Sequence, residues 1–160
     1  MRAIIQRAIN GKVSVNNKVI GEFTGPGLVI LVGVTHTDTP RESQKIAEKI
    51  HGLRIFDRDF ISQFDHICIP PSSPRELSLG ELGLPVLVIS QFTLYASTAK
   101  GRRPTWDAAA PGSIAEPLVD SVVQRFRDLG THVETGQFGA DMNVSFTNSG
   151  PMTLVIDVDA

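Results

Sequence analysis

The chain has 160 residues, about the length of one domain, and 15 Lys and Arg residues against 17 Asp and Glu residues give a net charge of −2. This charge excludes nucleic-acid binding through bulk positive charge, but not through a local basic patch. The single cysteine, Cys68, excludes an intrachain disulfide and favours a reducing compartment. No apolar run approaches the ~20 residues of a membrane span, and no signal-peptide pattern opens the chain, so we expect a cytoplasmic protein.

The first part of the chain is predicted to form strands. Residues 2–9 mix β-branched and polar residues, which predicts a first strand. The short runs 13–15 and 19–20 flank Asn16-Asn17, whose side chains tolerate positive φ, and this pattern predicts a hairpin. The continuous apolar run over residues 27–34 is typical of a strand buried on both faces.

Two helices are marked by their starts. Residues 39–42 read Thr-Pro-Arg-Glu, a capping box with proline at the first helical position, and Gly52 is expected to end this helix. A second capping box, Ser113–Glu116, predicts a helix that Gly130 ends. Apolar residues follow at helical spacing: Ile46, Ile50 and Leu53 in the first helix, and Leu118, Val122, Phe126 and Leu129 in the second.

The remaining segments complete a single domain over residues 1–160. Gly25-Pro26-Gly27 indicates a turn, the proline-rich residues 57–85 an irregular surface excursion, and residues 97–112 a polar loop. Further strands are predicted at 53–56, 86–95, 132–135, 142–147 and 152–158. Two helices among seven or eight strands, without regular βαβ alternation, predict an α+β fold with a mostly antiparallel sheet or barrel.

The usual signatures of metal and cofactor sites are missing from the sequence. The four histidines do not lie at metal-ligand spacing from other ligand types, and His66-Ile67-Cys68 is the nearest approach to a pair. No Gly-rich phosphate loop follows a strand, no Gly-x-Ser-x-Gly elbow occurs, and Cys68 has no activating motif around it. We therefore expect no metal and no cofactor.

Two polar segments are unusual for purely structural sequence. In Ser90–Tyr95, hydroxyls and an amide follow a buried strand, and a continued strand would place Ser90, Phe92 and Leu94 on one face. These groups could face a ligand or only satisfy neighbouring backbone. Asn148–Thr153 has the composition of a plain hairpin turn.

With these two segments the chain resembles the D-aminoacyl-tRNA deacylases, homodimeric enzymes that hydrolyse D-amino acids from mischarged tRNA. Ser90–Tyr95 matches the family segment SQFTLY in full, and Asn148–Thr153 matches NxGPVT except for Met152 in place of valine. The similarity also covers Gln6-Arg7, Gly27–Val34, Leu53–Phe56, Gly101–Pro104 and Phe138–Met142. Residues 57–80 depart from the family, because they are longer, richer in proline and lack its Gly-Lys-Met-Asn stretch.

The resemblance implies an active site, an adenosine pocket and a basic contact with tRNA. Ser90 and Gln91 would lie near the ribose and the ester, beside the main chain of Phe92 and Thr93. The adenine pocket would comprise Phe138, Gly139, Ala140 and Met142, for which turn-and-strand packing is the alternative. Phosphates near the acceptor end would meet Lys100, Arg102 and Arg103, for which a solvated loop is the alternative.

The resemblance also implies how one handedness is selected. A cis Gly150-Pro151 peptide would enter the active site of the partner subunit, where a rigid main chain would clash with an L-amino acid and admit a D-amino acid or glycine. Arg7 would brace this motif through hydrogen bonds to backbone oxygens, the alternative being a surface arginine. Asn148, Met152 and Thr153 would support the motif.

The expected mechanism needs no side-chain base. Thr93 could be drawn as a nucleophile, but no histidine or carboxylate lies within two residues of it. We expect the terminal ribose hydroxyl to help activate water, while backbone amides near Phe92 and Thr93 hold the oxyanion. Two other functions stay open: a non-catalytic relative that binds aminoacylated or single-stranded RNA, and a small-molecule acyl hydrolase that uses Thr93.

Overall fold

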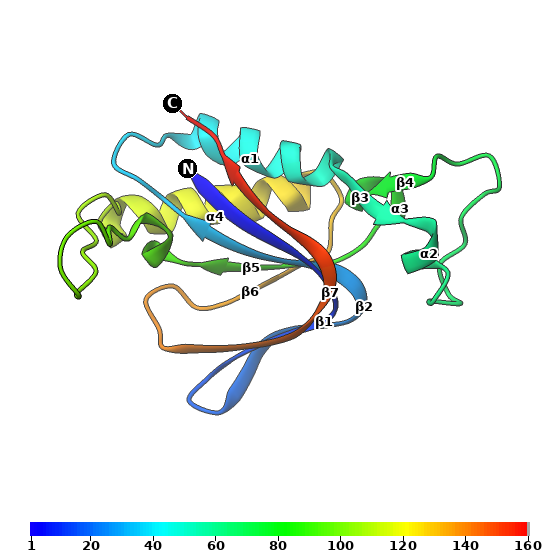
Figure 1. Cartoon of the computed structure of the whole chain (residues 1–160), viewed down its shortest axis with the longest axis horizontal. Coiled ribbons are helices and arrows are strands. Elements are labelled where there is room, and N and C mark those ends of the chain that lie inside the picture. Colours follow the sequence, from blue (N-terminus) through cyan, green and yellow to red (C-terminus); the bar gives the residue numbers. More distant parts are fainter. Residues whose placement is uncertain (160) are drawn as a thin grey trace.

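A five-stranded sheet with the order β6-β5-β2-β1-β7 forms the centre of the computed structural model, which describes residues 1–159 (Figure 1). β1 pairs antiparallel with β2 and β7, and β5 pairs parallel with β2 and β6. The sheet is therefore mixed, with the long ladders antiparallel, and the predicted α+β class with two main helices is confirmed. Its strands are β1 (Arg2–Val15), β2 (Lys18–Gly33), β5 (Val86–Ser90), β6 (Val133–Thr135) and β7 (Met142–Asp157).

Both helices, α1 (Pro40–Gly52) and α4 (Gly112–Asp128), cover the same face of the sheet (Figure 1). Leu28 and Ile30 of β2 belong to the core beneath these helices, whereas Val29 belongs to a smaller apolar cluster on the other face. The predicted burial of this strand on both faces is confirmed. In the described residues 1–159, no helix is long and apolar enough to cross a membrane.

The first two strands are longer than predicted. Asn16 and Asn17 have φ values of 50° and 62°, and they close the predicted hairpin. The segments on either side of it, however, are continuous strands, because a bulge in the β1–β2 ladder absorbs the irregular residues. Gly25, at a φ of 83°, bends β2 within this bulge, so the predicted turn at Gly25-Pro26-Gly27 was wrong.

The two predicted capping boxes have different outcomes. The first is confirmed, because the Thr39 side chain and Glu42 make both reciprocal capping bonds at the start of α1. The second was wrong: α4 begins at Gly112 with Pro111 as N-cap and no side-chain capping bond. The backbone decides this start, since Ala110 N donates to Val34 O at 2.9 Å and the Pro111 carbonyl accepts the first helical bonds.

Residues 57–85 are not simply a surface excursion. They contain α2 (Arg58–Ile61), β4 (Glu76–Ser78) and α3 (Leu79–Leu82), and β4 pairs antiparallel with β3 (Arg54–Asp57). Phe60, Ile61 and Leu79 are buried in the main core. The prolines lie between these elements, where the chain is mostly exposed. The predicted excursion was wrong because the apolar residues on either side of the prolines are buried and hold these elements to the core.

The predicted strand 86–95 ends early, at Ser90. Gly33 explains the change, because a Cβ there would lie 3.0 Å from the Leu94 Cβ and 3.1 Å from the Gln91 carbonyl oxygen. A bare backbone at this position lets the chain fold back against β2, where Gln91 N donates to Val32 O at 2.7 Å. The next residues form a 3-10 helix, η1 (Phe92–Tyr95), so the predicted strand alternation of Ser90–Tyr95 was wrong.

Residues 148–153 also differ from a hairpin turn. They lie within one continuous strand, β7, so the two strands predicted at 142–147 and 152–158 are a single element. In the ladder with β1, Asn148 faces Ala8 and Thr153 faces Gln6. Two steps along β1 thus correspond to five along β7, and the residues between bulge out of the sheet edge. The Gly150-Pro151 peptide within this bulge is cis, as the resemblance implied.

Candidate functional site

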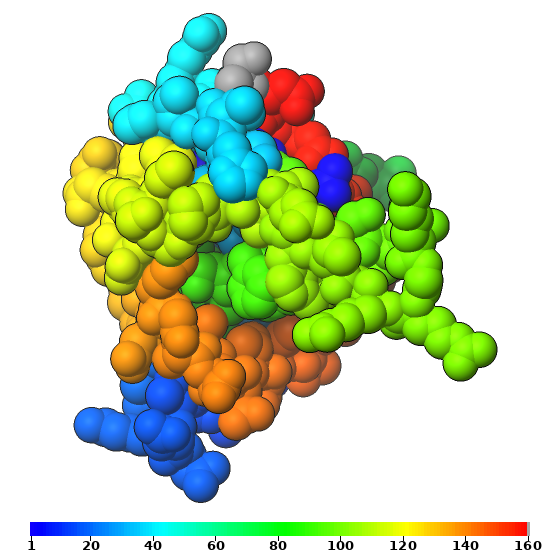
Figure 2. All heavy atoms as spheres, turned by 90° about the vertical axis from the view of Figure 1, so that its left-hand side faces the viewer, coloured from blue at the N-terminus to red at the C-terminus, as the bar shows by residue number. Residues whose placement is uncertain are grey.

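A cavity of about 610 Å³ opens where β5 ends and α4 begins. In Figure 2 it is a hollow between the yellow-green start of α4 and the orange segment that leads into β7. Its walls are mostly apolar, with Val32, Val34, Ile89, Ala115 and Val119 from the core elements. A cavity of this size and lining suits a small, partly aromatic ligand.

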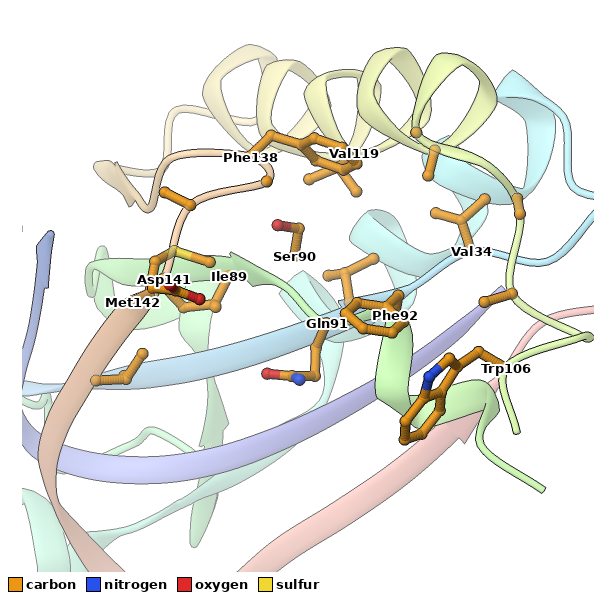
Figure 3. Close-up of a pocket in the computed structure, with 18 residues that line it drawn as sticks. Val34, Ile89, Ser90, Gln91, Phe92, Trp106, Val119, Phe138, Asp141 and Met142 are labelled. Atoms are coloured by element: carbon orange, nitrogen blue, oxygen red, sulfur yellow. The ribbon is translucent and has the colours of Figure 1, made fainter. Parts of the chain in front are cut away.

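The cavity brings together two segments that lie about 45 residues apart in the chain. Ser90, Gln91 and Phe92 line one side, and Figure 3 shows Phe138 and Val119 across the opening from them. The other predicted adenosine residues, Gly139, Ala140 and Met142, also line the cavity. Gly136 allows this arrangement, because a Cβ there would collide with the Met142 sulfur. The two segments meet, but their roles stay predictions.

Thr93 is the exception among the predicted catalytic residues, since it does not line this cavity. It is half-buried in η1, and its hydroxyl accepts a hydrogen bond from Gln91 Nε2. The Thr93 hydroxyl is thus engaged by Gln91, a residue that does line the cavity. Thr93 is therefore placed to orient Gln91.

Asp141 is the one titratable side chain among the described residues that line the cavity. Asp141 was not among the predicted site residues, although it lies between the predicted residues Ala140 and Met142. Four further lining residues were also not predicted and belong to the segment expected to be a polar loop: Trp106, Ala109, Ala110 and Gly112. The apolar content of residues 108–112 was the available signal.

Lys100, Arg102 and Arg103 are exposed and do not line the cavity. They lie on a loop whose two ends are joined by the isolated bridge between Ser97 and Thr105. In the described part of the chain, residues 1–159, no three His, Cys, Asp or Glu side chains gather where they could hold a metal ion.

Gly150 and Pro151 are exposed and lie outside the cavity of their own chain. A Cβ built on Gly150 would have open space around it, so the peptide surface is accessible from outside. Of the predicted supporting residues, Asn148 pairs with Ala8 and Met152 packs against the main core. The Thr153 hydroxyl donates to Gln6 Oε1 at 3.4 Å.

Arg7 is buried, with 5% of its surface exposed, so the alternative of a surface arginine is excluded. Its Nη2 donates to the Gly150 carbonyl oxygen at 3.5 Å, which is the predicted contact with the Gly-Pro motif. Its Nη1 donates to the Ile55 carbonyl oxygen at 2.9 Å and to Asp57 Oδ2 at 2.7 Å. The guanidinium lies over the Phe60 ring, 4.3 Å from its centroid, a cation–π contact.

Asp57 has two partners in this arrangement. Besides Arg7, it accepts a hydrogen bond from the Phe60 amide at 2.8 Å and so caps α2. Partial burial acts to raise the pKa of Asp57, but the hydrogen bonds from Phe60 and Arg7 outweigh it and hold this pKa below its ordinary value. The carboxylate thus stays charged opposite the buried guanidinium at neutral pH.

Two solved structures share this fold. One, titled "c-Myc DNA Unwinding Element Binding Protein", matches with a TM-score of 0.83 and 28% identity, covering 100% of both chains. The other, described as a probable eukaryotic D-amino acid tRNA deacylase, matches with a TM-score of 0.79 over 98% of both chains. Its 19% identity shows the fold alone.

The sequence comparisons are more specific. The family model described as D-Tyr-tRNA(Tyr) deacylase matches residues 4–157. A D-aminoacyl-tRNA deacylase of Cutibacterium acnes is 53% identical over 99% of this chain and 98% of its own length. Another, of Acidothermus cellulolyticus, is 50% identical over 99% of this chain and 100% of its own length. The chain belongs to the D-aminoacyl-tRNA deacylase family.

Proposed function

We propose that this deacylase hydrolyses the ester that joins a D-amino acid, or glycine, to the terminal adenosine of tRNA, and that it rejects L-aminoacyl-tRNA. The observation that carries the proposal is the cavity in which Ser90–Phe92 meet Phe138–Met142. The aromatic and apolar side suits the terminal adenine, and the polar side offers a hydroxyl and an amide to the ribose and the ester. The ester therefore lies next to Ser90 and Gln91.

Selection by handedness is proposed to come from the main chain of Gly150-Pro151 in a second copy of the chain. An enzyme that accepts many side chains must discriminate at the α-carbon, where main-chain atoms are the same for every substrate. Three features support this role: the motif is exposed, it bulges from the sheet edge, and its carbonyl is held by Arg7. Since the motif lies outside its own cavity, the partner subunit would supply it.

A homodimer is consistent with the exposed edge of the sheet. β7 is an edge strand of 16 residues, and long uncovered edges tend to pair with another chain. Near its end, Leu154 and Val155 are large apolar residues with 36% and 61% of their surface exposed. The Gly150-Pro151 bulge lies a few residues before them, so pairing along this edge would carry the motif to the partner.

The proposed chemistry relies on the substrate. Among the described residues that line the cavity, Asp141 is the one titratable group, and the Thr93 hydroxyl accepts a hydrogen bond from Gln91 outside the cavity. A general base contributes about 10²–10⁴-fold, whereas positioning supplies ~7–11 kcal/mol and one oxyanion donor ~3–4 kcal/mol. The terminal ribose hydroxyl would then help activate water, with the amides near Phe92 and Thr93 holding the oxyanion. No metal or cofactor enters the proposed reaction.

Lys100, Arg102 and Arg103 are proposed to contact phosphates near the acceptor end of the tRNA. They are exposed and lie on the loop next to the cavity-lining Trp106. Because three cations neutralise few phosphates, binding of tRNA should weaken only gradually as salt rises. A steep salt dependence would contradict so small a contact.

One assay tests the proposed function. The protein is incubated with D-tyrosyl-tRNA, L-tyrosyl-tRNA and glycyl-tRNA, and release of the amino acid is followed. Release from the D-tyrosyl and glycyl forms, with the L form intact, supports the proposal. Binding without release supports the RNA-binding alternative. Release from both enantiomers, or from simple esters, supports a general acyl hydrolase.

A further inference from the structure

Phe92 and Trp106 form an exposed aromatic pair at one side of the cavity. Their ring centroids are 5.6 Å apart with an interplanar angle of 83°, an edge-to-face contact. Both line the cavity, yet 55% of Phe92 and 42% of Trp106 remains exposed. In Figure 3 they lie on the opposite side of the cavity from Phe138 and Met142. An edge-to-face pair leaves ring faces free, so a planar group can stack on it.

Positive charge gathers beside this pair. Trp106 directly follows the bridge in which Ser97 and Thr105 exchange backbone hydrogen bonds of 2.8 and 3.0 Å. The loop closed by this bridge carries Lys100, Arg102 and Arg103, and Asp107 is the one acidic residue between positions 97 and 107. This stretch therefore has a net charge of +2, whereas the whole chain has −2.

We propose that Trp106 and Phe92 form a stacking site for the unpaired nucleotide that precedes the terminal adenosine of the tRNA. The proposal rests on the proposed function, which places the terminal adenine on the Phe138 side. Exposed aromatic faces flanked by cations recognise single-stranded nucleic acid, since the bases stack and the cations neutralise the phosphates between them. The chain would cross from the cavity over Trp106 toward the basic loop.

The amino acid of the substrate is the competing occupant of this surface, because its side chain could also contact Trp106. The basic loop favours the nucleotide. Every nucleotide brings a phosphate to Lys100, Arg102 and Arg103, whereas most aminoacyl groups carry no negative charge, and only aspartyl and glutamyl groups do. A polynucleotide that crosses this surface therefore explains both the aromatic pair and the cations beside it, whereas an amino acid explains only the aromatic pair.

A binding measurement tests the stacking directly, because Trp106 is the sole tryptophan of the chain. The intrinsic fluorescence is titrated with the trinucleotide CCA and, separately, with adenosine. We expect saturable quenching by CCA that clearly exceeds quenching by adenosine. Equal quenching by both ligands, or no response to CCA, would overturn the proposal.

Kinetics with two substrates test the function of the site. Trp106→Ala should lower kcat/KM for D-tyrosyl-tRNA by about 5- to 150-fold, the range for loss of one stacked base, and lower that for D-tyrosyl-adenosine far less, because this substrate lacks the preceding nucleotide. Trp106→Phe should retain most of the tRNA activity. Ile20→Ala, an exposed apolar residue outside the cavity, serves as the matched control and should change neither.

The other outcomes of this experiment are distinct. Equal loss on both substrates would place Trp106 against the adenosine or the amino acid, and no loss on either would remove it from binding; each result overturns the proposal. Retained activity of Trp106→Ala on D-tyrosyl-adenosine itself shows that the variant is folded. If wild-type protein hydrolyses neither substrate, the proposed function fails, while the fluorescence titration still tests the stacking site.

Discussion

The walls of the cavity come from β2, β5, η1, α4 and β7 and meet by apolar packing, whereas the Gly150-Pro151 bulge belongs to one edge strand and is held through a buried cation. An apolar wall built from many elements responds gradually to substitution, because neighbours can relax. A buried cation with one carboxylate partner responds abruptly, since loss of either partner leaves the other unpaired. Substitutions in the cavity wall should therefore have graded effects, whereas substitutions at the buried Arg7–Asp57 pair should have large ones.

The same comparison separates binding from selection. The cavity offers the surface that adenosine and ester would occupy, and the walls described above all come from one chain. The bulge does not line this cavity in its own chain and would act on the cavity of a second copy. Substitutions around Arg7 should therefore change discrimination between D and L substrates, and substitutions in the cavity should change turnover of both.

The largest effect is expected for Arg7→Met, which keeps an apolar stem but removes the charge. It leaves the Gly150 carbonyl and Asp57 without their partner, so the free energy of unfolding should fall by about 2–4 kcal/mol, below the range for a fully buried pair because Asp57 is partly exposed. Urea unfolding measures this loss. Arg2→Met is the control: its exposed pair with Asp157 should cost under about 1 kcal/mol. Equal losses of unfolding free energy in the two variants would show that Arg7 does not hold the Gly150-Pro151 motif in place.

Asp57→Asn should have a smaller effect that is centred on selectivity. Asparagine can still cap α2, but it no longer balances the Arg7 charge. We expect hydrolysis of L-tyrosyl-tRNA to rise about 3- to 10-fold, the equivalent of ~0.7–1.4 kcal/mol, with turnover of D-tyrosyl-tRNA nearly unchanged. Asp59→Asn, an exposed neighbour in α2, is the matched control. Unaltered selectivity in Asp57→Asn would show that the Arg7–Asp57 pair does not support selection by the Gly150-Pro151 motif.

The Asp57 pair also predicts a pH dependence of stability. Because its pKa is lower in the folded protein than the ordinary value of 3.8, the ionised carboxylate stabilises the fold above that value. This contribution should be constant at neutral pH and disappear as the pH falls through 3.8 and then through the lower folded value. The difference in unfolding free energy between wild type and Asp57→Asn should shrink over that window. A difference that grows on acidification would reverse the assigned sign.

The smallest effects are expected for Thr93→Val and Asp141→Asn, which remove a candidate nucleophile and a candidate base. If the substrate and main chain supply the chemistry, each variant should keep kcat/KM within about 10-fold of wild type, far from the 10²–10⁴-fold contribution of a true general base. Single-turnover hydrolysis of D-tyrosyl-tRNA measures this. Abolished turnover in Thr93→Val would favour covalent catalysis, and in Asp141→Asn a carboxylate base.

The sequence was sufficient to predict the structure where the conformation of a short stretch depends only on its own residues. The Thr39 capping box, the Asn16-Asn17 hairpin and the apolar run of β2 were predicted from such stretches and are confirmed. The resemblance to the family also indicated residues that line the cavity, although their roles stay predictions: Ser90, Gln91, Phe92, Phe138, Gly139, Ala140 and Met142. In these cases the residues that decide the structure are adjacent in the sequence.

Tertiary contacts decided the elements whose local signals were ambiguous. Contact with Gly33 turns Phe92–Tyr95 into a 3-10 helix, the Ala110–Val34 bond sets the start of α4, and pairing with β1 keeps β7 continuous through the Gly150-Pro151 bulge. The Arg7 guanidinium is held by Asp57 and Phe60, which lie some 50 residues away in the chain. Each outcome depends on atoms brought together only by folding, and no local pattern encodes which distant residue will be the neighbour.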